Sequence, residues 1–124
     1  MLKTLSVSES AIQCTYIKWL NLQYPAVADV TASFANGGKR DVRYGQRLKR
    51  EGLKKGFPDI GIFVANGKSH GMFIEFKSKK GVIKKEQKAT MTVLEAQGYT
   101  CAVCRSLEEA IDATSSYLRE LNVI

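Results

Sequence analysis

Two carboxylates and a lysine stand out in this 124-residue sequence because they border or interrupt apolar, strand-like segments. Asp59 immediately precedes the segment 60–65, and Glu75 and Lys77 lie within the segment 72–77. Alternate side chains of a strand share one face, so Glu75 and Lys77 point away from the apolar side chains that face the core. If the two segments pair as a hairpin, two carboxylates and one ammonium converge at one point on the sheet.

Two kinds of chemistry fit such a cluster. In the simpler one, Lys77 forms an ion pair with Asp59 or Glu75 on the sheet surface, a common arrangement that stabilises little. In the other, the carboxylates hold a hard cation, because Mg²⁺ typically takes one or two carboxylates together with substrate phosphates. Such an ion can activate a water molecule and polarise a phosphoryl oxygen. The spacing favours the cation site and leaves the ion pair open.

The shared face also constrains the hairpin. In a bulge-free pair of antiparallel strands, the residue numbers of every two opposed residues add up to the same sum. Opposed residues point to the same face of the sheet. For Asp59 and Glu75 to meet, that sum must be even. A two-residue turn at Asn66-Gly67 would make the sum odd. We therefore expect a loop of odd length, with five residues, in spite of the Asn-Gly signal.

Residue patterns predict the elements that position these side chains. Helical spacing of apolar residues, with Pro25 and Gly98 as stops, predicts helices over 6–24, 82–98 and 107–123, and the basic segment 39–52 is interpreted as a short helix. β-Branched and aromatic residues predict strands over 28–38, 60–65, 72–77 and 99–106. The helix over 82–98 is a crossover that sets the strand 99–106 parallel to the strand of Glu75. The expected fold class is α/β, a mixed β-sheet flanked by helices.

Charge is unevenly distributed along the chain, which carries a net charge of +7. The segment 39–88 contains 15 Lys or Arg and 5 Asp or Glu, a net charge of +10, whereas the remainder is net −3. Such a block favours a polyanion, most simply nucleic acid, with a solvated face as the alternative. Because the basic clusters flank the carboxylates, we interpret the block as a DNA-binding surface. The candidate contacts are Arg40, Arg43, Arg47, Lys54, Lys55, Lys79, Lys80, Lys84 and Lys85.

The cysteines indicate neither a disulfide framework nor a zinc site. Cys101 and Cys104 have CxxC spacing, but they lie in a strand-like segment, and the chain has no second such pair and a single histidine. We interpret them as reduced structural cysteines. No apolar run approaches the length of a membrane span, and the N-terminus lacks a signal-peptide core. We therefore expect a cytoplasmic protein.

The spacing Pro58-Asp59, fifteen residues, Glu75-Phe76-Lys77 matches the signature of the PD-(D/E)XK nuclease superfamily. The segments GFPDI, IEFKSKKG, KKEQKATMTVLEAQGY and SESAIQCTYIKWL together resemble the VRR-NUC family over nearly the whole chain. Four elements in this order are more specific than the bare motif. The resemblance implies a restriction-endonuclease-like fold and one VRR-NUC nuclease domain over 1–124. It also implies a small stand-alone protein of the type found in phages, in a bacterial or phage-infected cell.

The resemblance also implies roles for individual residues. Asp59 and Glu75 would ligate Mg²⁺ or Mn²⁺, with the main-chain carbonyl of Phe76 as a further ligand. Lys77 would orient the nucleophilic water. Glu9 matches an additional acidic residue of the family, which acts at the metal through a water molecule.

Glu9 and Gln87 each have an alternative interpretation. With Ser6, Glu9 fits a capping box, in which its carboxylate only bonds to the main chain. It also continues a helical stripe that should face inward, where a carboxylate needs a partner, and we favour the active site. Gln87, which matches a family glutamine, lies on an apolar helix face. It either bonds a sheet edge or steadies Glu75 or Lys77, and the resemblance favours the latter.

These observations predict a metal-dependent DNA endonuclease that hydrolyses phosphodiester bonds. By the resemblance, its substrate is branched DNA, such as the four-way junctions met in DNA repair. A homodimer is expected, because two-fold symmetry presents two sites to a two-fold substrate. Two alternatives stay open, a general duplex endonuclease or nickase and a non-catalytic DNA-binding module with the same fold. The intact Asp59, Glu75 and Lys77 argue against the second.

Overall fold

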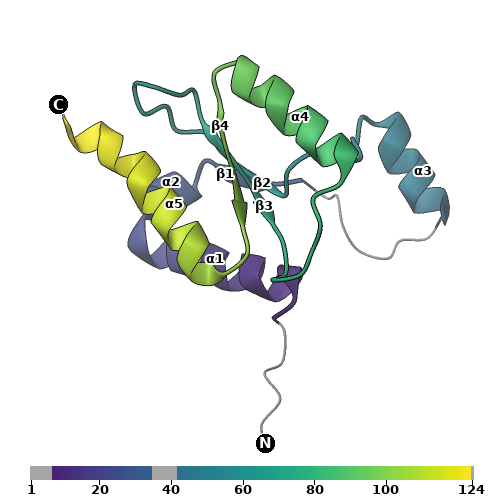
Figure 1. The fold of residues 1–124 in the computed structure, drawn as a ribbon, viewed down its shortest axis with the longest axis horizontal. Coiled ribbons are helices and arrows are strands. Elements are labelled where there is room, and N and C mark those ends of the chain that lie inside the picture. Colours follow the sequence, from purple (N-terminus) through teal and green to yellow (C-terminus); the bar gives the residue numbers. More distant parts are fainter. Residues whose placement is uncertain (1–6, 35–41, 124) are drawn as a thin grey trace, which may run out of the picture.

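A computed structural model describes residues 7–34 and 42–123, which form a four-stranded mixed sheet with helices on its two faces (Figure 1). The sheet has the order β1-β2-β3-β4, in which β2 is antiparallel to β1 and β3, and β4 is parallel to β3. The predicted α/β class and the parallel crossover are therefore confirmed. The elements are α1 (Glu9–Gln23), α2 (Pro25–Ala28), β1 (Thr31–Ser33), α3 (Val42–Arg50), β2 (Ile60–Ile62), β3 (Met72–Phe76), α4 (Lys85–Ala96), β4 (Thr100–Cys104), α5 (Leu107–Arg119) and the 3₁₀ turn η1 (Glu120–Val123).

Ser8 caps the N-terminus of helix α1, and its Oγ accepts the N–H of Ala11 at 3.1 Å. It ends at Gln23, close to the predicted end, but Pro25 then starts the short helix α2 instead of only terminating α1. Proline suits the first turn of a helix because the N–H it lacks would have no partner there. Of the strand predicted over 28–38, residues 31–33 form β1 and residues 35–38 lie outside the described residues.

The main core lies between the sheet and the helices α1 and α5, while α4 packs beside β4 on the other side (Figure 1). The Oη of Tyr16 and the Oγ1 of Thr114 lie 2.7 Å apart inside this core and join α1 to α5. The opposite face of the sheet carries an aromatic cluster centred on Phe73. The buried apolar residues of the main core are Ile12, Tyr16, Leu20, Ile60, Ile62, Met72, Ile74, Phe76, Cys104, Ala110, Tyr117 and Leu118.

The register of the β2–β3 hairpin is the one that the carboxylates require. Ile60 pairs with Ile74, and every pair in the ladder has the same even sum. Continued by one residue, this register places Asp59 across from Glu75 on one face of the sheet. The expectation of an even register and of a loop with an odd number of residues is confirmed.

The loop itself is longer than predicted, with nine residues (63–71) between the strands in place of five. The ladder stops early because the strand ends bond to other neighbours. The N–H of Phe63 donates to the carbonyl of Val30, and the N–H of His70 donates to the carbonyl of Gly98.

No helix within the two described ranges is long and apolar enough to cross a membrane.

Candidate active site

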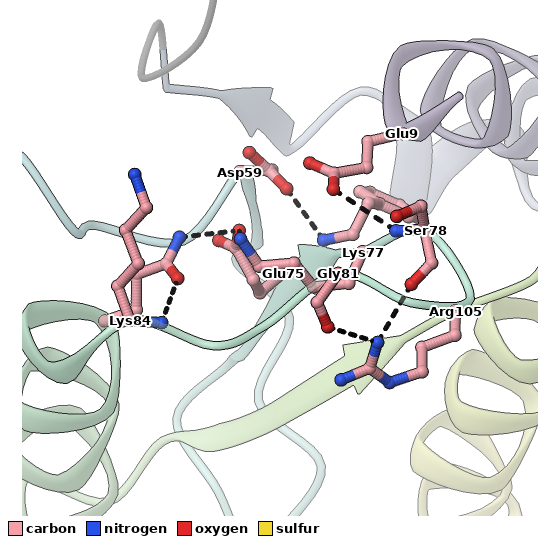
Figure 2. A network of polar contacts seen from close by, with 10 residues as sticks. Glu9, Asp59, Glu75, Lys77, Ser78, Gly81, Lys84 and Arg105 are labelled. Carbon is pink, nitrogen blue, oxygen red and sulfur yellow. Dashed lines mark hydrogen bonds and ion pairs between the residues drawn. The ribbon is translucent and has the colours of Figure 1, made fainter.

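Asp59, Glu75 and Lys77 meet where the β2–β3 ladder ends. The Oδ2 of Asp59 accepts the N–H of Phe76 at 2.7 Å, and the Nζ of Lys77 lies 3.5 Å from the Oε2 of Glu75. Figure 2 shows these charged side chains, together with Glu9, gathered around the end of β3. The structure therefore brings together the two carboxylates and the ammonium that the sequence singled out.

The ion pair between Glu75 and Lys77 is not an exposed surface pair. Only 5% of the Glu75 side chain and 9% of the Lys77 side chain are accessible to solvent. Charged side chains are seldom buried to this extent, because removing them from water costs more than a single pair returns. Burial of such a pair on a strand is typical of a functional site rather than of a solvated sheet surface.

Burial disfavours the charged forms of both carboxylates more than Lys77 favours them. Burial, and then the charge of Asp59, raises the pKa of Glu75 to about 7, although Lys77 opposes the shift. Burial also raises the pKa of Asp59, while the hydrogen bond from Phe76 opposes this. A cation held between two such carboxylates would favour their ionised forms.

The geometry around Phe76 adds a third oxygen to this pair. In an extended strand, the N–H and C=O of one residue point to the same side. The N–H of Phe76 points at Asp59, so its carbonyl faces that side as well, whereas the N–H of Lys77 points to β4 and donates to Cys104 at 3.0 Å. Two carboxylates and a carbonyl form an all-oxygen donor set, which suits Mg²⁺ or Mn²⁺.

This donor set is small. Among residues 7–34 and 42–123, no group of three or more His, Cys, Asp or Glu side chains is placed to hold a metal ion. Mg²⁺ sites that share substrate phosphates typically use one or two carboxylates and keep several waters. The residues around Asp59 and Glu75 therefore fit an ion that binds together with a phosphate, and do not fit a closed structural metal site.

Gln87 contacts Glu75, the second of its two interpretations, and it bonds to a helix cap instead of a sheet edge. Its Nε2 donates to the Oε2 of Glu75 at 3.0 Å, and its Oε1 accepts the N–H of Lys84 at 2.8 Å, which caps helix α4. Because the N–H of Lys84 can only donate, the amide orientation is fixed and Nε2 faces Glu75. Gln87 and Lys77 both contact the Oε2 of Glu75.

Glu9 lies at the edge of the site, but it is exposed rather than buried as expected. The expectation failed because Glu9 is the first residue of α1, before the buried stripe begins at Ile12. Ser8 caps the helix, and the proposed partner Ser6 lies outside the described residues. The Oε2 of Glu9 instead accepts the N–H of Ser78 at 3.2 Å, in the loop after β3. A carboxylate from α1 is thus attached to the strand that carries Glu75 and Lys77.

The basic candidates lie on two surfaces beside the site. Lys79 and Lys80 follow β3, and Lys84 and Lys85 begin α4, all with exposed side chains. Lys54 and Lys55, also exposed, precede β2, and the Nζ of Lys55 lies 3.6 Å from the Oε1 of Glu86 in α4. This ion pair brings the first segment next to the second.

Two of the three candidate arginines lie on α3, which stands apart from the sheet (Figure 1). Arg43 and Arg47 are exposed there, and the Nε of Arg47 is 3.2 Å from Glu51 in an ion pair along the helix. Arg40 lies outside the described residues. The structure therefore places α3 as an extension of the basic surface and not as a wall of the site.

Cys101 and Cys104 lie in β4, as the sequence predicted. Both are free, and burial raises the pKa of each thiol to about 11, so that neither is a reactive thiolate. Residues three apart in a strand point to opposite faces. Cys104 lies in the main core, while the Sγ of Cys101 contacts the carbonyl of Met91 in α4.

Arg105 is a residue of the site that the sequence interpretation missed. Its Nη1 donates to the carbonyls of Ser78 at 2.9 Å and of Gly81 at 2.6 Å, in the loop that also binds Glu9. The available signal was a lone arginine at the end of the strand 99–106, in an otherwise acidic part of the chain. Nothing in the sequence identified its partners, because they are main-chain carbonyls.

The model of the VRR-NUC domain family matches residues 7–108, most of the chain. The chain belongs to the VRR-NUC family. Membership of VRR-NUC establishes a nuclease-type fold that acts on DNA. A solved structure named VRR_NUC domain protein is similar, with a TM-score of 0.78 and 23% identity over 94% of this chain and 92% of that chain. At this identity the likeness establishes the restriction-endonuclease-like fold alone. No curated protein matches the chain.

Proposed function

We propose that this VRR-NUC chain is a metal-dependent DNA endonuclease that hydrolyses phosphodiester bonds in branched DNA such as four-way junctions. The observation that carries the proposal is the meeting of Asp59, Glu75 and a buried Lys77 at the end of β3. A strand surface without chemistry would not bury two charges of this kind.

Asp59, Glu75 and the carbonyl of Phe76 would hold Mg²⁺ or Mn²⁺, and Glu9 would assist through a water molecule. When bound, the ion lowers the pKa of a water molecule and polarises a phosphoryl oxygen. Lys77 orients the attacking water and stabilises the negative charge that develops on the phosphate. Gln87 holds the Glu75 carboxylate in place through its 3.0 Å hydrogen bond, so that the carboxylate does not have to reorganise during the reaction.

The basic surfaces support a substrate recognised by its shape. Lysines bind phosphates without reading sequence, and here they extend from the loop after β3 and the start of α4 to the segment before β2. Two neighbouring basic segments beside the site would contact two arms of a branched DNA. This arrangement favours junctions over a plain duplex.

A cleavage assay tests the proposal. Supercoiled plasmid, a flap and a four-way junction are incubated with the protein and Mg²⁺, Mn²⁺ or EDTA, with Asp59→Asn as the matched inactive variant. We expect metal-dependent cleavage, fastest on the junction, by the wild-type protein only. Equal cleavage of all three DNAs would favour a general duplex endonuclease or nickase. Tight binding without cleavage in either metal would favour a non-catalytic DNA-binding module.

A further inference from the structure

The loop that follows β3 contains a tight turn at residues 78–81, which the N–H of Gly81 closes by donating to the carbonyl of Ser78 at 3.0 Å. One side of the 78–81 turn faces Glu9. Its other side lines an open pocket of about 770 Å³ between the first turns of α1 and the start of α5. The residues of the turn that line the pocket, Ser78, Lys79 and Lys80, therefore face open space, and polar contacts help to hold the turn.

Arg105 supplies these contacts from the end of β4. Its Nη1 donates to the carbonyl of Ser78 at 2.9 Å and of Gly81 at 2.6 Å, and lies 3.4 Å from that of Lys79 (Figure 2). The main chain of Arg105 is fixed in turn, because its N–H donates to the Oε1 of Glu109 at 2.9 Å. Charge-assisted bonds from a rigidly placed guanidinium are among the stronger polar contacts in proteins.

The 78–81 turn is in direct contact with two site residues. The N–H of Ser78 donates to the Oε2 of Glu9 at 3.2 Å. A Cβ placed on Gly81 would lie 3.0 Å from the Oγ of Ser78, 3.2 Å from the Oε2 of Glu9 and 3.4 Å from the Cδ of Lys77. A side chain at this position would therefore press on the contact between Ser78 and Glu9.

We infer that Arg105 is a positioning residue, which holds the 78–81 turn so that the N–H of Ser78 fixes the carboxylate of Glu9 beside Lys77. Arg105 acts through the turn and does not touch the reacting atoms. Its effect on cleavage rests on the proposed function, whereas its effect on the turn can be measured without DNA or metal.

The first experiment measures the turn alone. Amide hydrogen exchange at Ser78 is followed by NMR in the wild-type protein and in Arg105→Lys, which keeps the charge but ends one bond short of Nη1. We expect Ser78 to exchange about tenfold faster in the variant, the effect of losing about one hydrogen bond. Glu9→Ala should give a similar increase. Arg119→Lys, at an exposed arginine at the end of α5 that bonds to Ser116, serves as the control without effect. Unchanged exchange at Ser78 in Arg105→Lys would overturn the inference.

The second experiment uses single-turnover cleavage of junction DNA at saturating protein. Arg105→Lys should lower the rate about 10- to 100-fold, as loss of an outer-shell partner typically does, with the Kd for DNA unchanged. The double variant Glu9→Ala/Arg105→Lys should be no slower than Glu9→Ala, because both changes remove the same interaction. If the rate losses of the two single variants multiply in the double variant, Arg105 acts independently of Glu9, and the positioning role is overturned.

A further variant and an internal check keep the two proposals separable. If Arg105→Lys does not fold, Gly81→Ala disturbs the turn from the side of Glu9 and should give the same faster exchange at Ser78 and the same non-additivity with Glu9→Ala. If the wild-type protein cuts no DNA, the proposed function fails. The exchange at Ser78 then still decides whether Arg105 holds Glu9.

Discussion

Lys77 has an environment that matters for catalysis because it is buried and its partner is also a proposed metal ligand. The Nζ of Lys77 is 3.5 Å from the Oε2 of Glu75, and residue 77 is 7% exposed. Such a lysine is pre-organised, so its position does not have to be established during the reaction. Its charge is nevertheless only one of 15 in the basic block, and its contributions to cleavage and to binding should therefore separate.

Replacement of this one side chain tests that separation. We expect Lys77→Ala to bind junction DNA with nearly wild-type affinity in the presence of a divalent ion, because affinity comes from the sum of many phosphate contacts. Its single-turnover cleavage should fall roughly 10²–10³-fold, as on loss of one electrostatic donor to a transition state. Lys68→Ala, at an exposed lysine paired with Glu120, is the control. Cleavage by Lys77→Ala at the wild-type rate would make the assigned mechanism wrong.

Glu75 should give the metal-free protein a pH-dependent stability. Its pKa is raised from 4.5 to about 7, so the folded state favours the protonated acid. The resulting stability is complete below about pH 4.5 and is lost as the pH rises through about 7. In EDTA, the melting temperature should therefore fall between about pH 4.5 and pH 7, and it should fall less in Glu75→Gln.

Metal adds a second part to this prediction. Mg²⁺ should raise the melting temperature more at about pH 8 than at about pH 6, because a proton and the ion compete for the same carboxylate. Thermal unfolding followed by circular dichroism measures all of these differences. Parallel curves for the wild-type protein and Glu75→Gln, with no response to Mg²⁺ at either pH, would contradict the assignment.

At the level of secondary structure, the sequence predicted what local periodicity determines. Alternation assigned Ile74 and Phe76 to the core and Glu75 and Lys77 to the opposite face, and the structure agrees. The even register followed from the requirement that Asp59 share that face, and it is also present. Both results depend on the two-residue period of a strand, which needs no knowledge of other elements.

Features that depend on contacts between distant elements were not predictable in this way. The predicted length of the hairpin loop was wrong because Phe63 and His70 bond to Val30 and Gly98, which belong to other parts of the chain. Arg105 was missed because carbonyl groups occur at every residue and leave no mark in the sequence. Glu9 was expected inside because its helical stripe is buried further along α1, and the position of the first turn of α1 depends on the loop after β3.

The start of α4 should contribute to DNA binding and not to the chemical step. Lys84 and Lys85 are exposed at the helix N-terminus, where backbone N–H groups also favour phosphate. Replacing both lysines by alanine should weaken junction binding and reduce the slope of log K against log salt by about 2. Single-turnover cleavage at saturating protein should be largely preserved.

The matched control for this variant removes two positive charges elsewhere. Lys68 pairs with Glu120 and Arg119 bonds to Ser116, both near the end of α5. The double variant Lys68→Ala/Arg119→Ala should leave the salt slope nearly unchanged, measured by fluorescence anisotropy over a range of salt concentrations. Equal effects of the two double variants would mean that net charge, and not a local DNA contact, determines affinity.

For the whole molecule, the proposed substrate has a consequence for assembly. A four-way junction has two-fold symmetry and two strands to be cut, whereas one chain presents one cluster of Asp59, Glu75 and Lys77. A two-fold dimer would present two such sites to the junction. We expect a dimer at micromolar concentration in light scattering or sedimentation, alone and with junction DNA. A monomer under both conditions, with paired cuts still made in one binding event, would contradict this expectation.

Phe76 connects the site to the thermal behaviour of the protein. Its peptide group faces Asp59, while its fully buried ring packs against Tyr16, with the ring centroids 5.6 Å apart. Any loosening of the core at this ring moves the peptide, and with it the proposed metal ligand, without a change in a polar side chain. Heat tolerance and turnover are therefore linked at this residue.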